Sequence, residues 1–222
     1  MDRKRFIKNS LAGIGGIVGI PSLLARCRDN EASPDENPGA CITSPRETSG
    51  PFPNKTPAQL VRENIVSDRT GVALLMTVTV QKQSNDCKPV EGAHVDVWHC
   101  DKDGNYSQYH NHSNASFLRG RQQTDENGQA SFISIFPGWY PGRAPHIHVE
   151  VLDSNLQSLL VTQIAFPADI YSEVYNSSDY NGAPDTSNSE DGVFSNSLSG
   201  NMADAVTGNM ADGYTLEKIL IV

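Results

Sequence analysis

The stretch HIHVEVL at residues 146–152 constrains the fold more than any other part of the chain. It alternates with period two, which places Ile and Val side chains on one face of a strand and His146 and His148 on the other. The apolar face has to be buried against a second layer of structure. The stretch therefore predicts a core strand whose opposite face carries two histidines, about 6.6 to 6.8 Å apart along the strand.

Five other stretches have the β-branched or alternating patterns of strands: GVALLMTVTVQ (71–81), AHVDVWHC (93–100), QASFISIF (129–136), SLLVTQIAF (158–166) and YTLEKILIV (214–222). Turn sequences such as DKDGN and DENGQ separate them. ADIYSEVY (168–175) predicts one short helix, and the repeated GNMAD near the C-terminus is interpreted as loop. With about seven strands expected, the pattern predicts an all-β fold: a β-sandwich of two packed, mostly antiparallel sheets with long loops and at most one or two short helices.

The N-terminal sequence is typical of an exported protein. Basic residues precede an uncharged run from Leu11 to Ala25, which predicts an export or lipoprotein signal over residues 1–26. LLARC resembles a lipoprotein box, so Cys27 is a candidate for lipid attachment to a membrane, with an ordinary cleaved signal or an uncleaved anchor as alternatives. We expect a flexible tether over 27–45, the domain over 46–222, and a location in the periplasm, cell envelope or extracellular space.

The net charge limits the classes of binding partner, and the cysteines indicate the redox compartment. The formal net charge of −9 argues against nucleic acid and anionic membrane surfaces as partners. Cys87 and Cys100 lie 13 positions apart on either side of a predicted strand, and an oxidising compartment would let them form a disulfide. Cys41 would then be free or paired with Cys27.

The histidine pair is a candidate metal site, although such pairs are often solvent-facing. Tyr140 lies six residues before His146 in the Gly/Pro-rich loop FPGWYPGRAP. A phenolate is a hard oxygen donor that suits Fe(III) better than zinc or copper(I); the alternative is a buried aromatic that caps the sandwich. Tyr106 directly follows the turn at residues 101–105, where it could face the Tyr140 loop.

Four stretches in a fixed order carry a family resemblance: ETSGPFP, PVEGAHVDVWHCDKDGNYS, RGRQQTDENGQASFISIFPGWYPGRAPHIHVEV and TQIAF. Together they resemble the short, exported branch of the intradiol ring-cleavage dioxygenases, of the catechol and protocatechuate type, over residues 45–222. The resemblance implies a non-haem Fe(III) held by Tyr106, Tyr140, His146 and His148. It also implies a reaction in which O2 cleaves a catechol between its two hydroxyls, giving a muconate-type dicarboxylate.

The resemblance also assigns roles to individual residues. Tyr140 matches the ligand that leaves the iron when catechol binds, whereas Tyr106 stays bound. Arg143 and Gln163 match catalytic residues that face the anionic substrate. Phe52, where many relatives have Tyr, is expected to contact the substrate. Trp139 is expected to wall the pocket by stacking, with simple packing at the sandwich end as the alternative.

Other functions remain open on the sequence. A secreted β-sandwich that binds aromatic or carbohydrate polymers without turnover is one alternative. A zinc hydrolase that uses His146 and His148 is another, with Glu150 as the main candidate for a third ligand. Arg119 and Arg121 are interpreted as surface residues on a strand edge, with a role in binding an anionic substrate as the alternative.

Overall fold

The computed structural model describes residues 41–222. Nine strands form the domain: β1 (Ala73–Lys82), β2 (Lys88–Pro89), β3 (His94–Trp98), β4 (Arg119–Gln123), β5 (Gln129–Ile135), β6 (His146–Leu152), β7 (Ser158–Ala165), β8 (Ala205–Asn209) and β9 (Gly213–Ile221). The helices are short: α2 (Ala168–Tyr175), α3 (Leu198–Asn201) and the single 3-10 turns η1 (Pro57–Gln59), η2 (Gln83–Asn85) and η3 (His110–His112). Within residues 41–222, no helix is both long and apolar enough to cross a bilayer.

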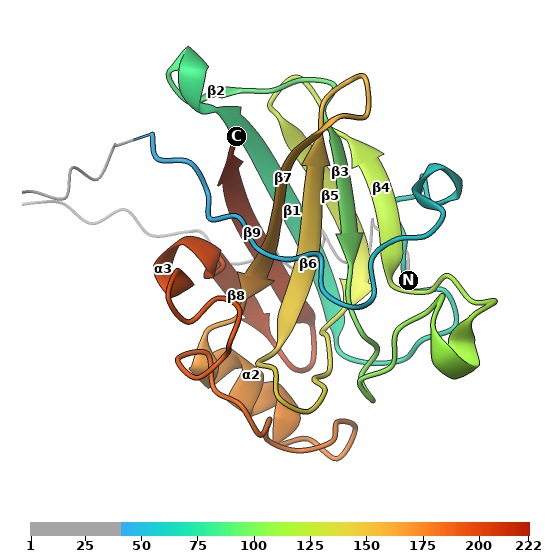
Figure 1. Ribbon diagram of the computed structural model, residues 1–222. Helices are drawn as coiled ribbons and strands as arrows, with labels where there is room; N and C mark the ends of the chain where they lie inside the picture. Colours follow the sequence, from blue (N-terminus) through green and yellow to red (C-terminus); the bar gives the residue numbers. More distant parts are fainter. Residues whose placement is uncertain (1–40) are drawn as a thin grey trace, which may run out of the picture. The chain divides into compact units, whose positions relative to one another are not determined.

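Two sheets pack against each other, as predicted (Figure 1). One has the order β4-β3-β6-β7 and is antiparallel throughout. The other has the order β2-β1-β9-β8, with β5 also paired to β1, and its one parallel pair is β1 with β9. Every second residue of β1 is buried, as are Ile147, Val149 and Val151 of β6, so the alternating faces meet in one core. The sandwich class is therefore confirmed.

Three strands were missed or misread from the sequence, for different reasons. β2 has two residues, too few to produce a period. β4 reads RGRQQ, which has no apolar alternation because its arginines are buried through polar contacts. β8 begins just after the first GNMAD, in a stretch interpreted as loop, and pairs with β9. The expected helix at 168–175 forms as α2.

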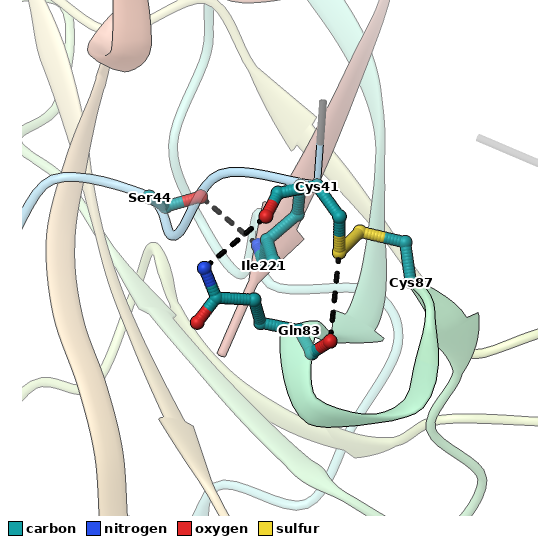
Figure 2. The surroundings of a disulfide bond; sticks show 5 residues. All are labelled: Cys41, Ser44, Gln83, Cys87 and Ile221. Carbon is teal, nitrogen blue, oxygen red and sulfur yellow. Dashed lines mark hydrogen bonds between the residues drawn. A yellow bond between two sulfur atoms is a disulfide. The ribbon is translucent and has the colours of Figure 1, made fainter. Parts of the chain in front are cut away.

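The predicted Cys87–Cys100 disulfide is wrong. Cys87 forms its disulfide with Cys41, with a Cα–Cα distance of 5.7 Å (Figure 2). Cys100 is a buried free thiol. Cys87 precedes β3 and Cys100 follows it, and a strand of five residues is about 16 Å long. Disulfides join Cα atoms no more than about 7 Å apart, so the strand keeps the two cysteines apart.

The segment that follows Cys41 is bound to the domain, so the expected tether ends before residue 45. The compact unit begins at Cys41. Ser44 donates its backbone N–H to Ile221 of β9, and Glu47 donates to Val161 of β7 (3.0 and 2.8 Å). The segment therefore crosses from one sheet to the other and covers the β7 edge. The predicted signal, most of the tether and the lipid-attachment candidate Cys27 lie outside the described residues.

Candidate metal centre

Both histidines of the pair are buried where β6 begins. His146 is 3% exposed and His148 is fully buried, so the solvent-facing interpretation is wrong. β6 lies between β3 and β7, and its register places His148 beside Trp98 on one side and Gln163 on the other. The Trp98 indole stacks parallel to the His148 ring at 5.0 Å. Period-two alternation turns both imidazoles to the same side, and their Nε2 atoms lie 3.1 Å apart.

The surroundings of these imidazoles favour their neutral, metal-binding form. His146 donates from Nδ1 to the Ala144 carbonyl at 2.6 Å, which leaves the Nε2 lone pair directed at the pair's shared centre. Burial lowers the pKa of His146 to about 3, and the nearby Arg143 charge acts in the same direction. Burial likewise holds the pKa of His148 well below its usual value. Metal ligation requires neutral imidazole, and burial maintains that state.

The two tyrosines meet because two turns approach each other closely. The Asp101 carboxylate caps its turn by accepting the backbone N–H groups of Asp103 and Asn105. The backbone N–H of Gly138 donates to the Asp101 carbonyl at 3.1 Å. A Cβ at Gly138 would lie 2.5 Å from that carbonyl oxygen, so only glycine allows this contact. The contact places Tyr140 beside Tyr106, with ring centroids 5.8 Å apart.

Four rings converge at this end of the sandwich: those of Tyr106, Tyr140, His146 and His148. Tyr140 lies 5.7 Å from His146, and Tyr106 lies 6.2 Å from His148, between ring centroids. Tyr106 is 3% exposed, and its hydroxyl has no hydrogen-bond partner among the described residues. Burial raises the pKa of Tyr106 well above its usual value and also raises that of Tyr140, so burial favours the neutral form of both phenols. Two neutral imidazoles and an unpartnered phenol oxygen fit a hard, highly charged metal ion such as Fe(III).

Arg143 connects this centre to its surroundings. Its guanidinium donates from Nη1 to the Tyr140 hydroxyl (3.3 Å), from Nη2 to the Gln163 side-chain oxygen (2.5 Å) and from Nε to the Asp191 carboxylate (2.8 Å). Gln163 is oriented by its own donation to the Thr48 carbonyl (2.8 Å). Arg143, Gln163 and Tyr140 thus form one hydrogen-bonded group.

Comparison with known proteins identifies the family. The model of the family described as Dioxygenase matches residues 48–179. The chain belongs to the intradiol ring-cleavage dioxygenase family. The structure of an intradiol ring-cleavage dioxygenase from Tetranychus urticae is 31% identical, with a TM-score of 0.75 over 82% of this chain and 94% of that one. The dioxygenase domain of a carbohydrate-binding fusion protein from Streptomyces is 25% identical, with a TM-score of 0.62 over 82% and 98%.

Curated relatives match over shorter segments. The protocatechuate 3,4-dioxygenase beta chain of Burkholderia cepacia is 33% identical over 119 residues, or 48% of this chain and 51% of that one. The chlorocatechol 1,2-dioxygenase of Rhodococcus opacus is 30% identical over 125 residues, or 47% and 48%. The chain thus spans about half the length of these relatives.

Two residues expected to contact substrate have different surroundings in this dioxygenase-family chain. Phe52 lies at the centre, stacked on Tyr106 at 4.7 Å and edge-on to Tyr140 at 6.1 Å. Trp139 packs against the main core and donates its indole N–H to the Gly182 carbonyl. These contacts favour the packing interpretation for Trp139.

Sequence reasoning misplaced two arginines of β4 on the surface. Arg119 is fully buried and donates to the carbonyls of Ser107 and Phe52. Arg121 is 5% exposed and forms a bidentate ion pair with the buried Asp96. The opposed register of Asp96 and Arg121 on β3 and β4 makes this pair possible, and only the strand pairing reveals it.

Proposed function

We propose that this protein is a non-haem Fe(III) dioxygenase that cleaves catechol-type aromatics between their two hydroxyls. The observation that carries the proposal is the buried convergence of Tyr106, Tyr140, His146 and His148, with the Tyr106 hydroxyl left unpartnered. Family membership supports the reaction class. These four side chains would hold the iron. When bound, Fe(III) supplies the Lewis acidity that draws both catechol oxygens to the site and makes the ring reactive toward O2.

The two tyrosines differ in ways that suit different roles. Tyr106 is buried, packed under Phe52, and has no alternative partner for its oxygen. Tyr140 is half-buried, on a loop, and its oxygen already accepts a hydrogen bond from Arg143. Tyr140 therefore keeps a hydrogen-bond partner if substrate displaces it from the metal, and its oxygen can accept a proton from the catechol. Tyr106 remains as the permanent ligand in this proposal.

Arg143 and Gln163 supply the polar surface that the substrate meets. The Arg143 guanidinium is a fixed cation beside the Tyr140 oxygen, where negative charge on the bound catechol would lie. In the reaction, the bond between the two hydroxyl-bearing carbons breaks. Each of these carbons becomes a carboxylate that keeps its own oxygen and gains one atom of O2, so no external reductant is needed.

The zinc-hydrolase alternative is not supported by the arrangement of ligands. A catalytic zinc ion takes three protein ligands, and His146 and His148 need a third from His, Cys, Asp or Glu. Within residues 41–222, no group of three such side chains is gathered to hold a metal, and Glu150 does not join the pair.

We further propose that the protein is exported. The Cys41–Cys87 disulfide supports an oxidising compartment, because cytosolic thiols are kept reduced. Cell fractionation followed by thiol alkylation without reductant tests this proposal. A protein found in the cytosol with both cysteines alkylated would contradict it.

Oxygen uptake by the iron-loaded protein tests the function. The purified protein is loaded with iron and supplied with catechol, protocatechuate and hydroxyquinol, and the products are identified by mass spectrometry with ¹⁸O2. We expect a visible tyrosinate-to-iron absorption band and ring-cleaved dicarboxylates that carry both labelled atoms. His148→Ala, which removes a ligand, is the control for adventitious iron. A coloured protein that binds catechols and consumes no O2 would favour the non-catalytic binding module instead.

A further inference from the structure

Asp191, a buried carboxylate outside the four proposed metal ligands, forms hydrogen bonds with Arg143 and Ala144. Asp191 is fully buried and accepts from Arg143 Nε and from the backbone N–H of Ala144, both at 2.8 Å on Oδ2. Its Oδ1 accepts from the backbone N–H of Val193 at 2.9 Å. A buried carboxylate needs such donors to offset its desolvation, and two of the three come from the stretch that leads into β6.

Asp191 belongs to a segment that lies beyond the residues matched by the family model, which end at 179. This segment, residues 182–191, contacts the Tyr140 loop at successive points. Gly182 accepts the Trp139 indole N–H at 2.9 Å, and Asp185 accepts the Gly142 backbone N–H at 3.0 Å. Trp139 and Gly142 lie on the Tyr140 loop, and so does Arg143, which donates to the Tyr140 hydroxyl. Within residues 182–191, the residue that bonds to Arg143 is Asp191.

We propose that Asp191 is the positioning residue for Arg143, an inference that rests on the proposed function. A guanidinium is planar, so an ion pair at Nε fixes the plane in which the two Nη groups lie. With Nε held by Asp191, Nη1 reaches the Tyr140 oxygen and Nη2 reaches Gln163. Without Asp191, the cation would be free to turn away from the site of reaction.

The same carboxylate acts on a metal ligand through one further residue. Asp191 fixes the Ala144 peptide through its N–H, and the Ala144 carbonyl accepts from His146 Nδ1. A hydrogen bond at the far nitrogen sets the ring orientation of a ligating histidine. Asp191 therefore orients both the cation and one imidazole, although it touches neither the substrate nor the metal in our proposal.

Asp191→Asn is the test variant, because it preserves size and removes the charge. An amide cannot accept on both sides, so Arg143 or Val193 would face an N–H donor. We expect kcat per bound iron to fall about 10- to 100-fold, the cost of a misplaced catalytic group. KM should stay within about threefold of the wild type, because the loss concerns the reacting state, whereas iron affinity should fall because His146 is less firmly oriented. Asp185→Asn, on the same segment but exposed, is the matched control and should leave kcat within the same threefold range.

A structural role alone would give a different result. It would lower iron content and melting temperature while leaving kcat per bound iron unchanged, and that outcome would overturn the proposal. If Asp191→Asn does not fold, Arg143→Lys tests the same bridge, since a single ammonium cannot reach Asp191, Tyr140 and Gln163 together. Activity of Arg143→Lys close to that of the wild type would also overturn the proposal.

Amide hydrogen exchange of the iron-free protein separates this inference from the proposed function. Asp191→Asn should speed exchange at Ala144, whereas Asp185→Asn should speed exchange at Gly142. If the wild type cleaves no catechol, the proposed function fails on its own terms. Unchanged exchange at Ala144 in Asp191→Asn would instead refute the positioning contact, whatever the activity.

Discussion

The unpartnered Tyr106 hydroxyl leads to a prediction with opposite signs in the iron-free and iron-loaded protein. Tyr106→Phe removes this hydroxyl and keeps the ring, which stacks on Phe52 in a residue that is 3% exposed. In the iron-free protein, this hydroxyl is buried and has no hydrogen-bond partner within residues 41–222. An unsatisfied buried polar group costs about 1–3 kcal/mol, so the variant should be more stable by up to that amount.

The expected change is large enough to measure by thermal unfolding. For a domain of this size, 1 kcal/mol corresponds to a shift of about 2–4 °C in Tm. We therefore expect the iron-free Tm of Tyr106→Phe to rise by several degrees. With iron present the order reverses, because the variant lacks one of the donors and gains less stability from the metal through mass action.

Tyr175→Phe is the matched control for this experiment. Tyr175 is 2% exposed, but its hydroxyl donates to the Pro137 carbonyl at 2.9 Å. Removing that hydroxyl leaves a buried acceptor unpaired, so this variant should be destabilised with or without iron, by about 1 kcal/mol. The reasoning is refuted if Tyr106→Phe lowers the iron-free Tm as Tyr175→Phe does, since Tyr106 would then have had a partner.

Three further predictions follow from buried polar and covalent contacts. Burial lowers the pKa of His99 to about 4, so the unfolded state binds a proton first as the pH falls. The free energy of unfolding should therefore fall by up to about 1.4 kcal/mol per pH unit between about pH 6.5 and 4, and His99→Gln should remove this one-proton contribution in urea unfolding measured across pH. Cys41→Ser with Cys87→Ser removes a crosslink between positions 46 apart and should cost about 2–4 kcal/mol, and equal stability with and without reductant in the wild type would contradict this. Arg121→Met strands the buried Asp96 charge and should cost about 3–5 kcal/mol, while the paired change with Asp96→Leu should restore much of the loss; an additive double variant would exclude the ion pair.

Much of the fold and the shared face of the two histidines were predictable from local pattern. The alternation in β6 fixes which side chains share a face without knowledge of any neighbour, so the histidine pair and the apolar face could both be assigned. Tyr106 and Tyr140 needed more, because a phenol in a loop has no period. The family motif located them, and the close approach of Gly138 to Asp101 explains physically why both turns end at one point.

The sequence failed where a partner lies far away along the chain and carries no periodic signal. The polar strand β4 gave no alternation, so Arg121 looked exposed until its pairing with β3 set it opposite Asp96. Cys41 was assigned to a tether, and its position beside Cys87 depends on the distant contacts of its segment with Ile221 of β9 and with Gln83.

Asp191 was likewise missed from the sequence, although it contacts Arg143 at the candidate metal centre. It lies in a polar stretch, SNSEDGVF, where one acidic residue looks like any other solvated loop residue. Its significance comes from the short stretch that it holds, which contains Arg143, Ala144 and His146. Any carboxylate that reaches the Arg143 Nε and the Ala144 N–H could do this, from whatever segment covers that end of the sandwich. We therefore expect the positioning contact to depend on geometry rather than on a fixed sequence motif.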